Sequence, residues 1–117
     1  MRNLLRSTVL CALLASPAIA EPVVSGSYYP MAGTAQYALS IGTNTTLTVP
    51  AGASGAEICV ETAGVRYTDD GTSASSSTGI PVAAGVCFQY FGNPAKMKFT
   101  AQTGSPTIDV SYYKLSE

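Results

Sequence analysis

The sequence contains no histidine and no tryptophan, and only 11% of its 117 residues are charged. Histidine is the usual general base near neutral pH and the commonest ligand of transition metals in proteins, so neither role has its ordinary residue here. A serine nucleophile would also lack its usual activating base. We therefore expect a protein with no catalytic site, no metal site and no cofactor.

Basic residues are scarce as well. Beyond position 20 the chain has four Lys and Arg residues against seven Asp and Glu residues, which gives a net charge of −3. Binding of nucleic acid needs a concentrated basic face that neutralises phosphates, so we expect no nucleic-acid partner. The same region contains 23 Ser and Thr residues, and its surface is therefore made polar mainly by hydroxyl groups.

The first twenty residues have the pattern of a secretory signal peptide. Two arginines among the first six residues precede a short apolar run, Thr8–Ala15, and Ala18-Ile19-Ala20 ends the segment on small residues. The apolar run is much shorter than the ~20 residues that span a bilayer, so we expect no membrane span. The pattern predicts a signal peptide over 1–20, export to the periplasm or the medium, and one domain over 21–117.

After position 20, short runs of β-forming residues alternate with Gly, Pro, Ser and Asn at intervals of roughly eight to twelve residues. Apolar residues recur at every second position in several runs, as in Ile58 and Val60 or in Ile108, Val110 and Tyr112. One apolar face per strand predicts two sheets packed together. We expect a single all-β domain, a small antiparallel β-sandwich of about seven strands with a jelly-roll or immunoglobulin-like arrangement. The predicted strands are Val23–Tyr29, Gln36–Ile41, Thr45–Val49, Ala56–Tyr67, Gly85–Phe91, Lys96–Ala101 and Thr107–Lys114, and Gly64 predicts a bulge or bend within the longest of them.

Two cysteines lie beyond position 20. Cys59 and Cys87 both fall on the polar face of their predicted strands, while Val86, Phe88 and Tyr90 are expected to point inward. An exported chain meets an oxidising compartment, where an even number of cysteines favours a disulfide over two separate thiols. We predict a Cys59–Cys87 bridge, which would stabilise the fold by about 3–4 kcal/mol.

The segment Thr68-Asp69-Asp70-Gly71-Thr72 has the acids of a calcium loop but neither the alternating acids nor the distal glutamate of one. We interpret it as a turn in which the Asp side chains accept hydrogen bonds from backbone amides. A serine-rich loop, Thr72–Thr78, follows it.

Tyrosines occur as two adjacent pairs, Tyr28-Tyr29 and Tyr112-Tyr113. Tyrosine is enriched at interfaces because one end of the ring system is apolar and the other is polar. These four residues are candidate contacts for a protein or a glycan partner. The alternative is that they fill the margin of a core that contains no tryptophan.

The segment Val65–Thr72, followed by Gly79–Gly85, resembles a group of small β-sandwich proteins encoded by tailed bacteriophages and prophages. Lys98–Gln102 and Ile108–Tyr113 are similar to the closing strands of that group. The resemblance implies a non-enzymatic virion structural component, such as a head decoration or fibre-associated protein, that self-associates or docks on a capsid. The predicted signal peptide leaves a second function open, a secreted or periplasmic binding or adhesion module at an envelope surface.

Overall fold

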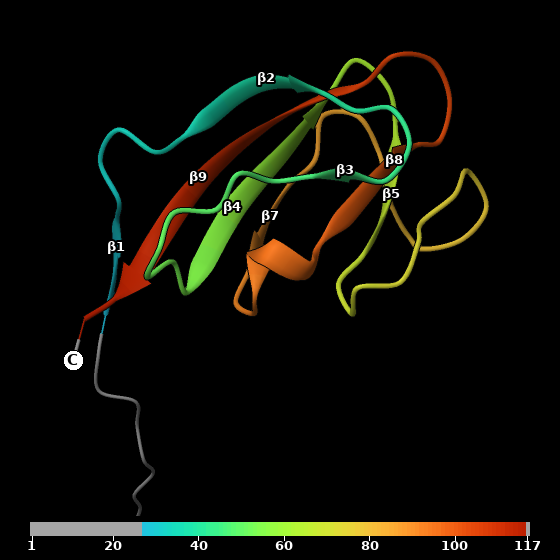
Figure 1. Ribbon diagram of the computed structural model, residues 1–117. Helices are drawn as coiled ribbons and strands as arrows, with labels where there is room; N and C mark the ends of the chain where they lie inside the picture. Colours follow the sequence, from blue (N-terminus) through green and yellow to red (C-terminus); the bar gives the residue numbers. More distant parts are fainter. Residues whose placement is uncertain (1–26, 117) are drawn as a thin grey trace, which may run out of the picture.

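Nine β-strands in two antiparallel sheets make up the part of the chain that the computed structural model describes, residues 27–116 (Figure 1). The strands are β1 (Tyr28–Pro30), β2 (Gln36–Ser40), β3 (Thr45–Thr46), β4 (Gly55–Glu61), β5 (Val65–Thr68), β6 (Ile80–Val82), β7 (Cys87–Tyr90), β8 (Lys98–Ala101) and β9 (Thr107–Leu115), with a short 3₁₀ helix, η1 (Pro94–Lys96), before β8. The first sheet has the order β1-β9-β4-β7, with β2 also paired to β9, and the second has the order β3-β8-β5-β6. The predicted all-β antiparallel sandwich is confirmed. The predicted signal peptide, and the start of the first predicted strand at Val23, lie outside the described residues.

The core lies between the two sheets and follows the alternation of the sequence. Apolar side chains at every second position of β4 and β9 are buried, and so are Val65 of β5, Val82 of β6 and Phe99 of β8. The buried apolar residues that form this core are Ile41, Leu47, Ala56, Ile58, Val60, Val65, Val82, Met97, Phe99, Ile108, Val110 and Tyr112. Burial of these side chains is the main force that holds the sheets together.

The predicted strand Ala56–Tyr67 is two strands, because the chain changes sheets within it. Strand β4 ends in the first sheet and β5 begins in the second. In the connection between the two strands, the Ala63 N–H donates to the Glu61 carbonyl (2.9 Å). Thr62, the residue between Glu61 and Ala63, has φ +69°. This three-residue turn reverses the chain as tightly as a backbone allows. The bend predicted near Gly64 is therefore confirmed, and a Cβ at Gly64 would lie only 3.3 Å from the Val82 carbonyl oxygen.

The prediction that Val86 points inward is wrong, since its side chain is 42% exposed. Ala83–Val86 form a turn in which the Val86 N–H donates to Ala83, with Gly85 at φ +88°. Val60 then faces both Gly85 and Val86, because it accepts from the Gly85 N–H and donates to the Val86 carbonyl. Two residues opposite one form a β-bulge with glycine in its left-handed position, which turns Val86 outward.

Other strand boundaries differ from the predicted ones for local reasons. Strand β6 lies in a segment expected to be a loop, and it forms because Val65–Tyr67 pairs with it. Pro94–Lys96 adopt a 3₁₀ turn capped by the Asn93 side chain, so β8 begins at Lys98. Within the described residues, no helix is long and apolar enough to cross a membrane.

Hydrogen bonds hold the serine-rich loop against the outer face of the second sheet. The Arg66 guanidinium donates from Nε to the Ser76 carbonyl (3.0 Å) and from Nη1 to the Gly79 carbonyl (2.9 Å). Deeper in the loop, Ala74 is buried, its N–H donates to Asn44 Oδ1 (2.8 Å), and its carbonyl accepts from Thr100 Oγ1 (3.1 Å). A segment of low sequence complexity thus has a defined conformation.

Candidate functional site

Three aromatic side chains, two of them exposed and one half-buried, meet at one end of the first sheet. Tyr28 comes from β1, Phe91 directly follows β7, and Tyr113 lies on β9; we call them the aromatic cluster. The Tyr28 and Phe91 ring centroids are 4.9 Å apart with the planes tilted by 45°, a favourable arrangement for two aromatic rings. Both rings remain accessible, with Tyr28 41% and Phe91 59% exposed. Large apolar groups left this exposed are candidates for contact with a partner.

Strand register explains why these three residues meet. Tyr113 lies opposite both Pro30 of β1 and Gly55 of β4, and Gly55 is the inner neighbour of the segment that carries Phe91. Glycine leaves room above the sheet here, since a Cβ at Gly55 would lie 3.1 Å from Phe91 Cδ1 and 3.5 Å from Tyr28 Cε1. The two rings therefore lie over a glycine, and a larger residue there would press on the Phe91 ring.

A shallow pocket of about 300 Å³ opens beside these rings. Tyr28, Phe91 and Tyr113 line it together with Ala56 and the side chain of Gln89. Its volume is at the lower end of the range for small-molecule sites. The pocket thus offers aromatic faces and one amide group, and its lining includes no charged residue.

The predicted tyrosine contacts separate into two groups. Tyr28 and Tyr113 belong to the aromatic cluster, whereas Tyr29 is exposed and alternates with Tyr28, so it points to the opposite face of its strand. The prediction for Tyr112 is wrong, because it is 1% exposed and its ring fills the core. Phe91 was not among the predicted contacts, although it continues the outward pattern of Cys87 and Gln89.

Tyr112 has a structural role, since its buried hydroxyl is hydrogen-bonded within the sandwich. The hydroxyl donates to Gln36 Oε1 (2.6 Å), and the same oxygen accepts from the Thr48 N–H (3.0 Å). Burial raises the pKa of Tyr112 to about 12. The phenol is therefore kept neutral inside the sandwich and is satisfied by one neighbour.

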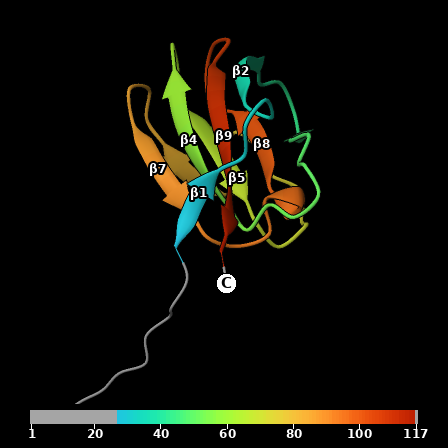
Figure 2. The same cartoon turned by 90° about the vertical axis from the view of Figure 1, so that its left-hand side faces the viewer.

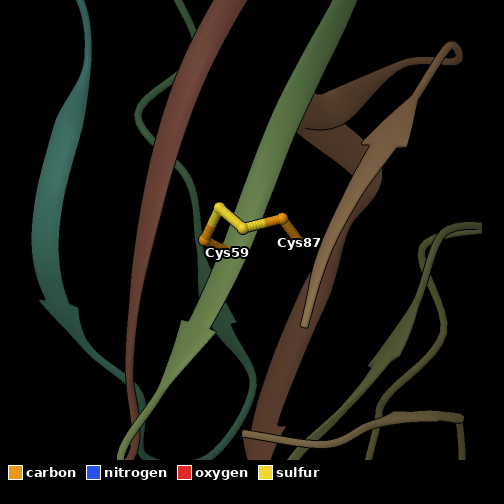
Figure 3. Close-up of a disulfide and its surroundings, with 2 residues drawn as sticks. All are labelled: Cys59 and Cys87. Atoms are coloured by element: carbon orange, nitrogen blue, oxygen red, sulfur yellow. A yellow bond between two sulfur atoms is a disulfide. The ribbon is translucent and has the colours of Figure 1, made fainter. Parts of the chain in front are cut away.

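The predicted disulfide is confirmed, and it bridges the first sheet on its outer face (Figure 3). Cys59 of β4 and Cys87 of β7 are directly opposite in the register, and the bond joins residues 28 apart in sequence. The chain between them leaves the first sheet, forms β5 and β6 of the second, and returns. The bridge therefore closes a loop that passes through both sheets.

Acidic residues surround the disulfide. Glu57 and Glu61 flank Cys59 on the same face of β4, and Asp109 of β9 lies opposite Cys59. The Asp109 carboxylate accepts from the Ala38 N–H (2.8 Å) and so fixes the irregular part of β2. Within residues 27–116, no group of three or more His, Cys, Asp or Glu residues is placed to hold a metal ion.

The Asp69-Asp70 turn has the structural role predicted for it. Asp70 Oδ1 accepts hydrogen bonds from the Thr72 hydroxyl (2.6 Å) and the Thr72 N–H (3.1 Å), and the hydroxyl bond is the main reason that the pKa of Asp70 is lowered. Burial, and then the nearby charge of Asp69, raise the pKa values of Tyr67 and Tyr90. Asp70 thus serves the turn, whereas Asp69 lies beside Tyr90, and the two acids do not face each other across a cleft, as glycosidase carboxyls do.

A second hollow, of about 540 Å³, lies where three loops meet beyond the ends of the strands. Its lining consists of small and hydroxyl-bearing residues, and none of them is acidic or basic. These residues are Ser40, Ile41, Gly42, Thr43, Ala74, Ser75, Ser76, Thr100, Ala101, Gly104 and Ser105. A nucleophile in this hollow would have no neighbouring base among them.

The chain matches no protein-family model, no curated protein and no solved structure. The aromatic cluster is therefore interpreted from its own geometry. Exposed rings, a polar side chain at their margin and an absence of acid–base pairs around them are features of a binding surface.

Proposed function

We propose that this protein is a non-enzymatic docking module that attaches to another protein through the aromatic cluster, in the manner of a virion decoration component. The observation that carries the proposal is the pair of exposed rings, Tyr28 and Phe91, packed at 4.9 Å beside Tyr113. Aromatic residues near the centre of a contact surface supply much of the affinity of protein complexes. The resemblance of Val65–Gly85 to small phage β-sandwich proteins supports a capsid or tail surface as the partner.

Export is part of the proposal. The signal-like pattern over residues 1–20 supports passage into the periplasm or the medium. The Cys59–Cys87 bridge is consistent with that, because disulfides persist in oxidising compartments and are rare in the cytosol. A hydroxyl-rich, weakly charged exterior suits a protein that works outside the cell.

A glycan is the second candidate partner, and Gln89 is the observation that favours it. An amide that lines a pocket beside two exposed aromatic faces matches the way proteins hold sugars, with the ring stacked and a hydroxyl hydrogen-bonded. The protein-docking proposal is preferred because Tyr28 and Phe91 leave large aromatic surfaces exposed beside a pocket of only about 300 Å³.

The test compares two tyrosine variants on purified particles. Particles from cells that encode this protein are analysed by mass spectrometry, and rebinding of labelled protein to particles stripped of it is then measured. Tyr28→Ala should weaken rebinding at least about tenfold, because it removes one of the packed rings. Tyr37→Ala is the matched control, since Tyr37 is 74% exposed outside the cluster and should bind like the wild type.

Each alternative has a distinct result. Absence of the protein from the particles contradicts the virion proposal. A glycan array on which wild-type protein binds and Tyr28→Ala does not would favour the sugar partner. Equal behaviour of Tyr28→Ala and Tyr37→Ala in both assays would show that the aromatic cluster is not a binding surface.

A further inference from the structure

Strand β7 has a neighbour on one side only. It ends the order of the first sheet, and Figure 2 shows it at the margin of that sheet beside β4. Val60 directs both its N–H and its carbonyl toward β7. Because this direction alternates along antiparallel strands, Phe88 and Tyr90 bond to β4, and the main-chain groups of Cys87 and Gln89 point away from the sheet. Phe91 continues that outward series.

The other edge strands in residues 27–116 carry features that prevent pairing. Strand β6 contains Pro81, β1 contains Pro30, and β3 is two residues long. Strand β2 is irregular between Gln36 and Leu39, where Ala38 has φ +54°. Proline, bulges and very short strands are the usual protection of a sheet edge against other chains. Strand β7 contains no proline, and its bulge at Gly85–Val86 lies before its first residue, so all four of its residues are regular.

The composition of β7 gives no protection either. Its sequence, Cys-Phe-Gln-Tyr, contains no charge and no proline, and an exposed apolar residue lies at each end, Val86 and Phe91. The Cys59–Cys87 bridge ties this strand to β4, so the edge is held in the sheet. An anchored, uncharged edge with free amides is a template for an added strand.

We propose that β7 pairs antiparallel with β7 of a second copy of this chain, with Gln89 on the twofold axis. The pairing joins the two first sheets into one continuous sheet. In this register Gln89 lies opposite Gln89 of the second copy, and Cys87 lies opposite Phe91, so every outward-facing residue of the strand has a partner. If the register between the two β7 strands shifts by two residues in either direction, one of the residues whose main chain points outward either has no partner or lies against the bulge at Gly85.

The strand suits a twofold interface because it is complementary to itself. On the inner side of the edge, Phe88 meets Tyr90 of the second copy, and aromatic cross-strand pairs of this kind stabilise sheets. No like charges lie opposite each other in this register, since β7 itself contains no charged residue; Glu57 lies one strand further in, and Asp69 lies beside the Tyr90 side chain. The inference goes beyond the proposed function, because it needs no partner other than this protein, although Gln89 and Phe91 lie at both surfaces.

The test uses the backbone of Gln89 and purified protein alone. Sedimentation equilibrium should show a dimer for the wild type and for Gln89→Ala, which keeps the main chain. Gln89→Pro removes the outward N–H and leaves the bonds between β7 and β4 in place, so the dimer dissociation constant should rise about tenfold or more. Circular dichroism confirms that each variant is folded.

A pair of charge variants tests the register and does not rely on Gln89→Pro folding. Gln89→Lys and Gln89→Glu should each be monomeric at low salt, because like charges meet on the axis, and an equimolar mixture should form a mixed dimer. A wild type that is monomeric at every concentration, a dimer unaffected by Gln89→Pro, or charge variants that do not recombine would overturn the proposal. A dimer that survives Tyr28→Ala while particle binding is lost separates this inference from the proposed function.

Discussion

Removal of the disulfide by Cys59→Ser with Cys87→Ser should lower the stability of the fold by an amount that the sequence separation fixes. For residues 28 apart, the chain-entropy estimate gives a loss of about 12 cal/mol/K in the unfolded state, or about 3.6 kcal/mol at 298 K. Both cysteines lie on the outer face of the first sheet, so the substitutions open no cavity in the core. For a domain of this size the melting temperature should fall by roughly 15–30 °C.

Thermal unfolding followed by circular dichroism measures this difference, with and without reductant. The matched control is Glu57→Ser with Gln89→Ser, the next opposed pair on the same face of β4 and β7. It removes one half-buried and one exposed polar side chain and no cross-link, so its stability should stay within about 1 kcal/mol of the wild type. A variant without the bridge that melts at the same temperature as this control would refute the entropic reasoning. Two thiols that alkylate without reduction would show that the bridge is absent.

Two further predictions concern the core tyrosine and a loop glycine. Tyr112 has its pKa raised to about 12 from about 10, so its contribution to stability is complete below pH 10 and is lost as the pH rises through about 12. Urea unfolding between pH 9 and about 12 should therefore show a steeper loss for the wild type than for Tyr112→Phe, and parallel curves would contradict the assigned burial. Gly79→Ala should cost about 2 kcal/mol more than Gly52→Ala, because both glycines have positive φ but only at Gly79 would a Cβ meet a backbone atom, the Tyr67 oxygen at 2.8 Å. Chemical denaturation of the two variants measures the difference. An equal loss of unfolding free energy in both would show that the backbone around Gly79 moves to make room for the Cβ.

Period-two alternation was enough to predict which side chains of β4 and β9 form the core. Ile58, Val60, Ile108 and Val110 are buried as expected, and the polar-face placement of Cys59 and Cys87 brought the two sulfurs together. Such patterns are readable because every second residue of a strand must meet the same environment.

Long-range geometry explains what the pattern missed. The crossing at Thr62 depends on β5 pairing with β8, a contact between distant segments that the local sequence does not encode. Val86 turned outward because a glycine-containing turn inserted one residue into the ladder. Alternation had already grouped Tyr112 with Val110, so the sequence held the signal that separates Tyr112 from Tyr113. Phe91 continues the outward alternation of Cys87 and Gln89, but its contact with Tyr28 depends on the register of β1, β9 and β4, which local sequence does not encode.

The position of β9 has a consequence for the order in which the protein folds. This strand is the last of the described strands, yet it lies between β4 on one side and β1 and β2 on the other. Gly55–Glu61 of β4 pair with residues of β9. The first sheet therefore cannot assemble while residues 107–115 are still inside the ribosome. Contacts of such long sequence separation also form slowly. A nascent chain therefore keeps its first sheet open until β9 has emerged.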